Sequence, residues 1–367
     1  MEDTASKSAF DTLLTKFNVP HILEKIFFSL DYDSFRECRK VRKDWKELLS
    51  SDKYDNKSEE MRKEKIKNEI KLCTASKLGN IQEVRELLGS GVNKNCERDS
   101  RGRTPLHFAT LGGRTNVVKL LLEVGANVYK ADDKGNTPLH VAAGLSRKFV
   151  TIAKMLIDGG ADPDQADMYG WTPLHVAART NISMCEILLA AGADPNRADN
   201  KGWTPLHTNY LTSCRAQLLI AAGADTNKSD KDGSTPLHQA VEWGYKDVVQ
   251  ILLDAGAEPN KADKKGDTPL HWAARIKTND METGYGDGIG RDEKAILEKV
   301  QILVNRGAKP NIANKLELTP LDVAKARQNP NQDVINVLES HKRKNASGQN
   351  DMATKRRKRK GIGSSQS

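Results

Sequence analysis

The chain has 367 residues, more than one ordinary compact domain, so several domains or one long repeat array are expected. Hydrophobic residues make up 37% and aromatic residues 5% of it, which argues against one deep core and favours a shallow core of leucine and small side chains. The net charge of +9 lies almost wholly after residue 341, where nine basic residues accompany one acid, Asp351, so nucleic-acid binding by the nearly neutral body of the chain is not expected.

Neither a membrane span nor a secretory signal is expected. No run approaches the ~20 consecutive apolar residues that cross a membrane. The N-terminal extension, residues 1–18, has no apolar run behind a basic start. The cysteines are odd in number and not closely paired, which predicts free thiols in a reducing compartment rather than disulfides or a zinc site. They are Cys38, Cys73, Cys96, Cys185 and Cys214.

Residues 19–49 carry apolar side chains at helical spacing. Leu23 is followed by Ile26, Phe27 and Leu30, at +3, +4 and +7, which places all four on one helical face. Short helices within about thirty residues cannot bury a large core, so such a segment needs a partner to cover its apolar face. A helical cap for the repeats, or a generic interaction helix, is the alternative interpretation.

This run resembles an F-box, with Val19 in place of the usual leucine and one residue fewer between Pro20 and Ile22. The resemblance implies a small helical segment that docks onto the Skp adaptor of a cullin-based ubiquitin ligase. The residues that it implies for adaptor binding are Pro20, Leu23, Ile26, Phe27, Leu30, Phe35, Val41 and Trp45.

Residues 50–69 are rich in charges of both signs. This composition predicts a solvated linker helix between the F-box-like segment and the rest of the chain.

A repeat fills the middle of the chain. Thr-Pro-Leu-His begins at 104, 137, 172, 204, 235 and 268, and Thr-Pro-Leu-Asp begins at 319, with spacings of 33, 35, 32, 31, 33 and 51. A Gly-Ala pair keeps step with it. In one unit, Thr235 is suited to cap a helix that starts at Pro236, and Leu237 and Ala240 give it one apolar stripe. A second, more apolar helix begins at about Val248, and only stacked neighbours can bury both faces.

These motifs resemble the ankyrin repeat, over most of the chain. The resemblance implies an all-α solenoid of about eight repeats across residues 70–341, with degenerate first and last units that act as caps. Two departures stand out. The repeat at 202–232 is short and is expected to be distorted, and an 18-residue insertion is expected to form a surface loop at about 277–294.

Six histidines belong to the repeat motif, one whole repeat apart, too far for shared metal binding. Their expected role is a hydrogen bond between turn and helix. No nucleophile–base set or carboxylate pair stands out, so neither catalysis nor a cofactor is expected.

Tryptophan is concentrated on one side of the repeat. Trp171 and Trp203 precede Thr-Pro, and Trp243 and Trp272 follow on the short helix. The resemblance implies that these positions face a groove that holds a target protein, although each ring packing on the neighbouring turn is an equal alternative. The predicted target-binding residues are Met168, Tyr169, Trp171, Arg179, Lys201, Trp203, Glu242, Trp243, Trp272 and Arg275.

Residues 342–367 form a basic tail that is expected to be disordered. Its two clusters resemble a bipartite nuclear import signal, which implies binding to an importin and residence in the nucleus or cytoplasm. Nonspecific binding to RNA, DNA or acidic lipid is the alternative. The predicted import residues are Lys342, Arg343, Lys344, Lys355, Arg356, Arg357, Lys358, Arg359 and Lys360.

Together these features predict a non-catalytic adaptor, the substrate-recognition subunit of a Skp–cullin–F-box ligase with its target in the repeat groove. A nuclear ankyrin scaffold or transcriptional cofactor without a ligase is the alternative.

Overall fold

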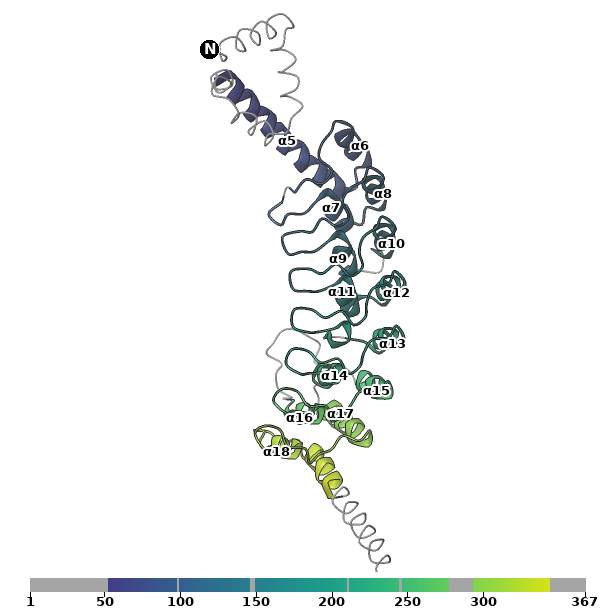
Figure 1. Ribbon diagram of the computed structural model, residues 1–367, viewed down its shortest axis with the longest axis vertical. Helices are drawn as coiled ribbons and strands as arrows, with labels where there is room; N and C mark the ends of the chain where they lie inside the picture. Colours follow the sequence, from purple (N-terminus) through teal and green to yellow (C-terminus); the bar gives the residue numbers. More distant parts are fainter. Residues whose placement is uncertain are drawn as a thin grey trace, which may run out of the picture.

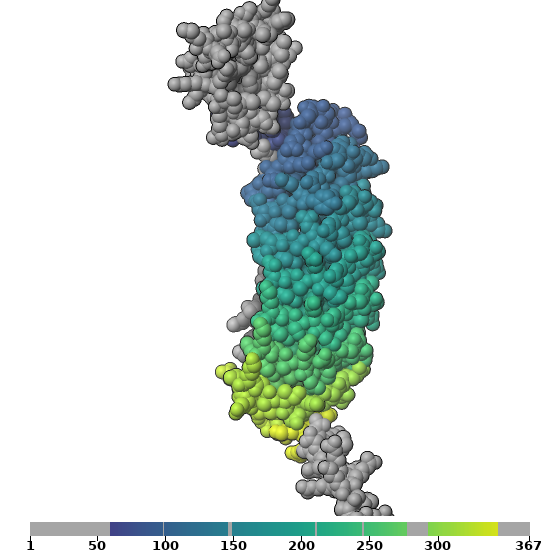
Figure 2. All heavy atoms as spheres, in the orientation of Figure 1, coloured from purple at the N-terminus to yellow at the C-terminus, as the bar shows by residue number. Residues whose placement is uncertain are grey.

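The computed structural model describes residues 52–97, 99–145, 149–209, 211–243, 246–276 and 293–343. Within these residues every regular element is a helix and none is a strand. Figure 1 shows the helices stacked in chain order along one long axis, and Figure 2 shows the described atoms as one elongated, curved body. The predicted all-α solenoid is confirmed.

Within the described residues, eight helix pairs form the stack, as the repeat count predicts. Each pair has an inner helix, which is short in every pair but the first, and an outer helix, and each kind packs on its counterparts in the neighbouring pairs. The pairs are α5 (Asp52–Leu78) with α6 (Ile81–Gly89), α7 (Pro105–Leu111) with α8 (Thr115–Glu123), α9 (Pro138–Ala143) with α10 (Val150–Asp158), α11 (Pro173–Thr180) with α12 (Ile182–Ala190), η2 (Pro205–His207) with α13 (Ser213–Ala221), α14 (Pro236–Trp243) with α15 (Lys246–Asp254), α16 (Pro269–Arg275) with α17 (Glu293–Asn305), and α18 (Pro320–Lys325) with helical residues 332–343.

The core is as shallow as the composition predicts. On α14, Leu237, Ala240 and Val241 are buried, and on α15 so are Val248 and three further aliphatic side chains. Each unit alone would leave these faces in water, so burial depends on the stacked neighbours.

A turn, here called a finger, precedes the Thr-Pro of each unit from the second onward. The seven fingers lie at 99–103, 132–136, 167–171, 199–203, 230–234, 263–267 and 314–318. They project to one side of the stack in Figure 1. The first residue of each closes the turn with its side chain: Asp199 Oδ1 accepts from the backbone N–H of Lys201 at 2.7 Å and of Trp203 at 2.8 Å.

Backbone hydrogen bonds join each finger to the next. The N–H of Met168 donates to Lys134 O, and that of Asn200 donates to Tyr169 O, both at 2.9 Å. Gly170 has a φ of 82°, and a Cβ there would approach Asn200 N to 2.6 Å, so only glycine satisfies both constraints. The last finger has Glu317 at this position, with a φ of 60°.

The six motif histidines tie neighbouring units together. His175 Nδ1 accepts from the Thr172 N–H at 3.1 Å, so its Nε2 carries the proton and donates to Trp203 O at 2.9 Å. The other five make the same two bonds, as expected of them. Burial lowers the pKa of all six, to about 4 for His207 and His238.

Helix α5 crosses the expected boundary between linker and repeats. It has 27 residues and runs without a break from Asp52 to Leu78. Glu69, Leu72 and Ala75 are already buried against the array, so the linker helix and the first inner helix are one element.

Three other regions depart from the regular unit. In the fifth, the inner helix shrinks to the three residues of η2 and Thr208 turns extended, which is the distortion expected at 202–232. The insertion lies outside the described residues except for its last two, 293–294, which begin α17. The final helix continues to residue 343, two residues into the expected tail, where Arg343 pairs with Glu339 at 3.9 Å.

Two more observations concern membranes and thiols. None of the helices in the described part of the chain is both long and apolar enough to cross a membrane. Cys73, Cys96 and Cys185 are buried thiols that form no disulfide, and Cys214 is an exposed one.

Candidate functional site

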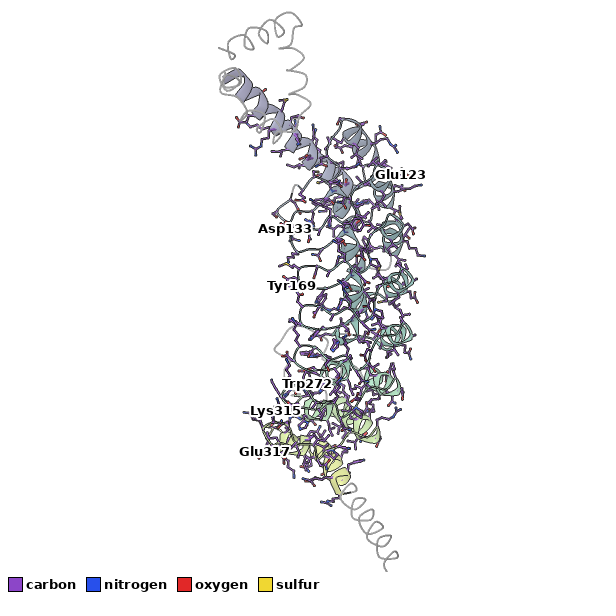
Figure 3. All side chains as sticks on the ribbon, viewed as in Figure 1. Glu123, Asp133, Tyr169, Trp272, Lys315 and Glu317 are labelled. Carbon is purple, nitrogen blue, oxygen red and sulfur yellow. The ribbon has the colours of Figure 1, made fainter. Side chains whose placement is uncertain are left out.

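The finger side of the stack presents charged and aromatic side chains. Figure 3 places Asp133, Tyr169, Lys315 and Glu317 along it, and Glu123 of an outer helix on the opposite side. Met168 and Tyr169, at the tip of the third finger, are 56% and 55% exposed. Large apolar side chains held so far out are typical anchors of a protein interface.

Three tryptophans are held at the bases of the fingers, each by an aspartate. The indole N–H of Trp171 donates to Asp199 Oδ2 at 3.0 Å, and that of Trp203 donates to Asp230 Oδ2 at 3.1 Å. Both bonds reach from one finger to the next. These rings therefore have a structural role, and they remain half-buried with part of their surface open.

The third of these rings, Trp272 on α16, donates to Asp263 Oδ2 at 3.1 Å. It also meets the ring of His238 edge-on, with 5.2 Å between ring centres. The indole therefore packs against the finger that precedes its own helix.

A cation covers each of these three rings. The distances from charged group to ring centre are 5.3 Å for Arg179 over Trp171, 5.9 Å for Lys201 over Trp203, and 5.3 Å for Arg275 over Trp272. Six of the ten predicted target-binding residues thus form three pairs, one in each of three units. A cation over an indole is attracted by the ring, which positions the charge for a partner.

The remaining predicted pair, Glu242 and Trp243, ends helix α14. Glu242 is half-buried, and Trp243 is 40% exposed.

A groove of about 930 Å³ lies at the C-terminal end of the finger side, between the last two fingers, α16 and α18. We call it the C-terminal groove. Of its residues, only Arg275 was among the predicted target-binding residues. The charged and apolar residues that give it its character are Lys264, Lys265, Arg275, Lys315, Leu316 and Arg327.

The groove escaped prediction for an identifiable reason. Lys265 and Lys315 belong to consecutive fingers, but the insertion separates them by 50 positions, which obscures their proximity in the sequence. The signal that could have found the groove was the position of a residue within its finger. Lys265 occupies the same position in its finger as Lys201, which was predicted to bind the target.

The other predicted sites lie largely beyond the described residues. All eight adaptor-binding residues, Pro20 to Trp45, fall outside them, as do Lys344 and the cluster at 355–360. Lys342 and Arg343 end the last helix and are exposed. Within the described ranges, no three His, Cys, Asp or Glu side chains gather as a metal site would require.

Comparison with known families agrees with this geometry. A model of three ankyrin repeats matches residues 72–167, 145–210 and 209–281, and a single-repeat model matches residues 265–315. Since these matches cover more than half of the chain, it belongs to the ankyrin-repeat family. Proteins of this family are typically non-catalytic binding scaffolds, and these repeats likewise serve to bind protein.

Individual relatives share only short stretches. The chain is 35% identical to the 2-5A-dependent ribonuclease of Mus musculus over 77 residues, 21% of this chain and 10% of that protein. It is 44% identical to the potassium channel GORK of Arabidopsis thaliana over 71 residues, 19% and 8% of the two chains. It is 38% identical to the Arabidopsis E3 ubiquitin-protein ligase KEG over 76 residues, 21% and 5%. Each match spans far less than two thirds of the relative.

Proposed function

We propose that this chain is the substrate-recognition subunit of a Skp–cullin–F-box ubiquitin ligase. The observation that carries the proposal is the run of residues from Pro20 to Trp45, which match the F-box pattern in sequence order and lie N-terminal to the linker and the repeats. Residues 19–49 dock onto the Skp adaptor, and the finger side of the repeats holds the target.

Helix α5 supports the assignment of adaptor binding to residues 19–49 and of target binding to the repeats. Its 27 residues give a rod about 40 Å long. Its C-terminal part is buried in the first repeat, so its exposed part extends from the array as a fixed arm. An arm of this kind holds a target at a constant distance from the ligase.

The mechanism is proximity. A target bound to the rigid stack presents its lysines to a ubiquitin-conjugating enzyme at high effective concentration, without bond-making by this chain. The paired cations and aromatic rings of the finger side provide the contacts that select the target.

The test is a pull-down of the purified chain with a Skp adaptor, beside a Leu23→Asp, Phe27→Asp double variant. The matched control is Ile70→Asp, Leu78→Asp, which places the same charges at exposed positions of α5. We expect the parent and the control to bind and the double variant to lose binding. Circular dichroism checks that all three keep their repeats. A folded parent that does not bind the adaptor overturns the ligase proposal.

A second candidate is a nuclear ankyrin scaffold or transcriptional cofactor. Two basic clusters favour it, at 342–344 and 355–360, of which Lys342 and Arg343 are exposed at the end of the last helix. We propose that both clusters bind an importin. A fluorescent fusion of the whole chain is expected in the nucleus, and neutralising both clusters should shift it to the cytoplasm. Unchanged localisation would contradict the import role.

A further inference from the structure

The C-terminal groove is rich in positive charge. Besides Arg275 and Arg327, it contains Lys264, Lys265 and Lys315, all on the tips of the last two fingers. Among the residues that the structure describes, none of these three lysines has a carboxylate within ion-pair distance.

The carboxylate that lines the groove is already engaged. Asp267 is only 5% exposed, and it accepts from Arg275 Nη1 at 3.1 Å and from Asn314 Nδ2 at 2.7 Å. It neutralises Arg275 and leaves the charge of the lysines uncompensated.

The groove also has an apolar part. Leu316 is 75% exposed, more than any other large hydrophobic side chain of the described residues, and Leu318 is 37% exposed. At the equivalent tip position the six preceding fingers carry charged residues or Tyr169. The next residue, Glu317, has the left-handed conformation that favours glycine, and together these features hold an apolar side chain out beside three cations.

We propose that the C-terminal groove binds an acidic segment of a partner protein that carries one large apolar side chain. The carboxylates of the segment contact Lys264, Lys265 and Lys315, and its apolar side chain covers Leu316 and Leu318. A nucleic acid would engage the lysines but leave Leu316 in water, so a peptide matches more of the surface. This inference rests on the proposed role of the finger side in holding a target, and it specifies the chemistry of that target.

The experiment measures fluorescence anisotropy of labelled peptides with the full chain. The probes are a short peptide of glutamates around one phenylalanine, a copy with serine for phenylalanine, a copy with lysines for the glutamates, and a single-stranded oligonucleotide. We expect the first peptide to bind most tightly, and its affinity to fall as salt rises.

Two groove variants, each with a control, test whether the peptide binds in the C-terminal groove. Replacing Lys264, Lys265 and Lys315 with glutamate is expected to weaken binding at least about tenfold. Replacing exposed Lys119, Lys154 and Lys228 of the outer side and its loops makes the same change of net charge and should leave affinity unaltered. Leu316→Ser should reduce the affinity to that of the serine peptide, and Ile70→Ser is its control.

Several outcomes would overturn the proposal. They are equal binding of the glutamate and lysine peptides, tighter binding of the oligonucleotide, and an unchanged affinity in the triple variant. A fourth concerns the chain's own insertion, which carries Asp280, Glu282 and Asp287. If the glutamate peptide binds only after these three are changed to amides, the groove is covered by the chain itself.

These readouts are independent of the ligase. The peptide assay contains no adaptor, and the adaptor pull-down does not require the groove. If a target is later captured by the fingers around Met168 and Tyr169 while the groove variants leave its binding unaltered, the groove inference fails and the recognition role stands.

Discussion

At the scale of single residues, an aspartate occupies a position that asparagine holds in the units that follow. Asn196 Oδ1 accepts from the Asp225 N–H, and its Nδ2 donates to Gly223 O at 2.9 Å, and Asn227 makes the same two bonds one unit later. Asp164 occupies the position equivalent to Asn196 in the preceding unit. Its carboxylate accepts from Asp194 N at 3.0 Å but has no proton to donate.

Asp164→Asn is expected to stabilise the protein. The new amide can donate to Gly192 O, the carbonyl equivalent to Gly223 O, for a gain of about 1 kcal/mol in the free energy of unfolding. Burial, with the neighbouring charges of Asp194 and Asp162, raises the pKa of the Asp164 carboxyl. The parent's penalty is therefore present above that pKa and disappears as pH falls through it, so the gain should shrink in acid. Urea unfolding of both proteins across pH measures this, and a gain that does not depend on pH would show that the carboxylate is not responsible.

Glu317→Gly is a second substitution that is expected to stabilise the protein. Its φ of 60° is unfavourable for a side chain, and glycine relieves a strain of about 1 kcal/mol. Gly266→Ala is the opposite control, because its φ is 80° and its Cβ would meet Lys315 N at 2.8 Å. We expect the two variants to shift the thermal midpoint in opposite directions, and a stability loss in Glu317→Gly would mean that the side chain makes a compensating contact.

At the scale of elements, a buried lysine joins two helices across the insertion. Lys299 of α17 is fully buried, and its Nζ donates to Val241 O of α14 at 2.9 Å. Val241 lies near the end of α14, where carbonyls lack helical partners and the helix dipole favours a cation.

Lys299→Met is expected to destabilise the protein by about 2 kcal/mol, because it keeps the packing volume but removes the buried hydrogen bond to Val241 O. Lys294→Met, at an exposed position of the same helix, should change little. Chemical denaturation compares the two. Equal effects would show that the hydrogen bond to Val241 does not contribute.

Some features of the helices and their contacts could be predicted from the sequence, and others could not. The repeat period predicted the helix pairs, the caps and the histidine bonds, because each follows from local residues and spacing. The continuity of α5 was not predictable in this way, since its first half is charged on all sides and has no apolar period to set a boundary. Buried Lys299 and the C-terminal groove depend on units brought together across an insertion, and the repeat spacing does not show which side chains meet there.

At the scale of the whole molecule, stability is shared along the stack and is coupled to protons. Each motif histidine bridges two units through its neutral form, and adding a proton to Nδ1 would break its bond from the threonine N–H. The last unit has Asp322 instead, which accepts from the Thr319 N–H at 2.9 Å. No described unit follows the last one, so the residue at this position does not need to donate a hydrogen bond to a neighbouring unit.

The whole array is therefore expected to lose stability in mild acid. Burial is the main cause of the lowered histidine pKa values, so the unfolded chain takes up protons first as pH falls below about 6.5. This stability is fully present above that pH and is lost progressively toward the folded-state value, which is about 4 for His207 and His238. Each histidine contributes at most ~1.4 kcal/mol per pH unit. Denaturation midpoints measured from neutral pH to about pH 5, above the range where most carboxylates titrate, should fall steadily. Proton resonances of the rings of His207 and His238 in the folded protein should not titrate over that range. If they titrate near pH 6.5 while the repeats remain folded, the bridging role of the neutral imidazoles is wrong.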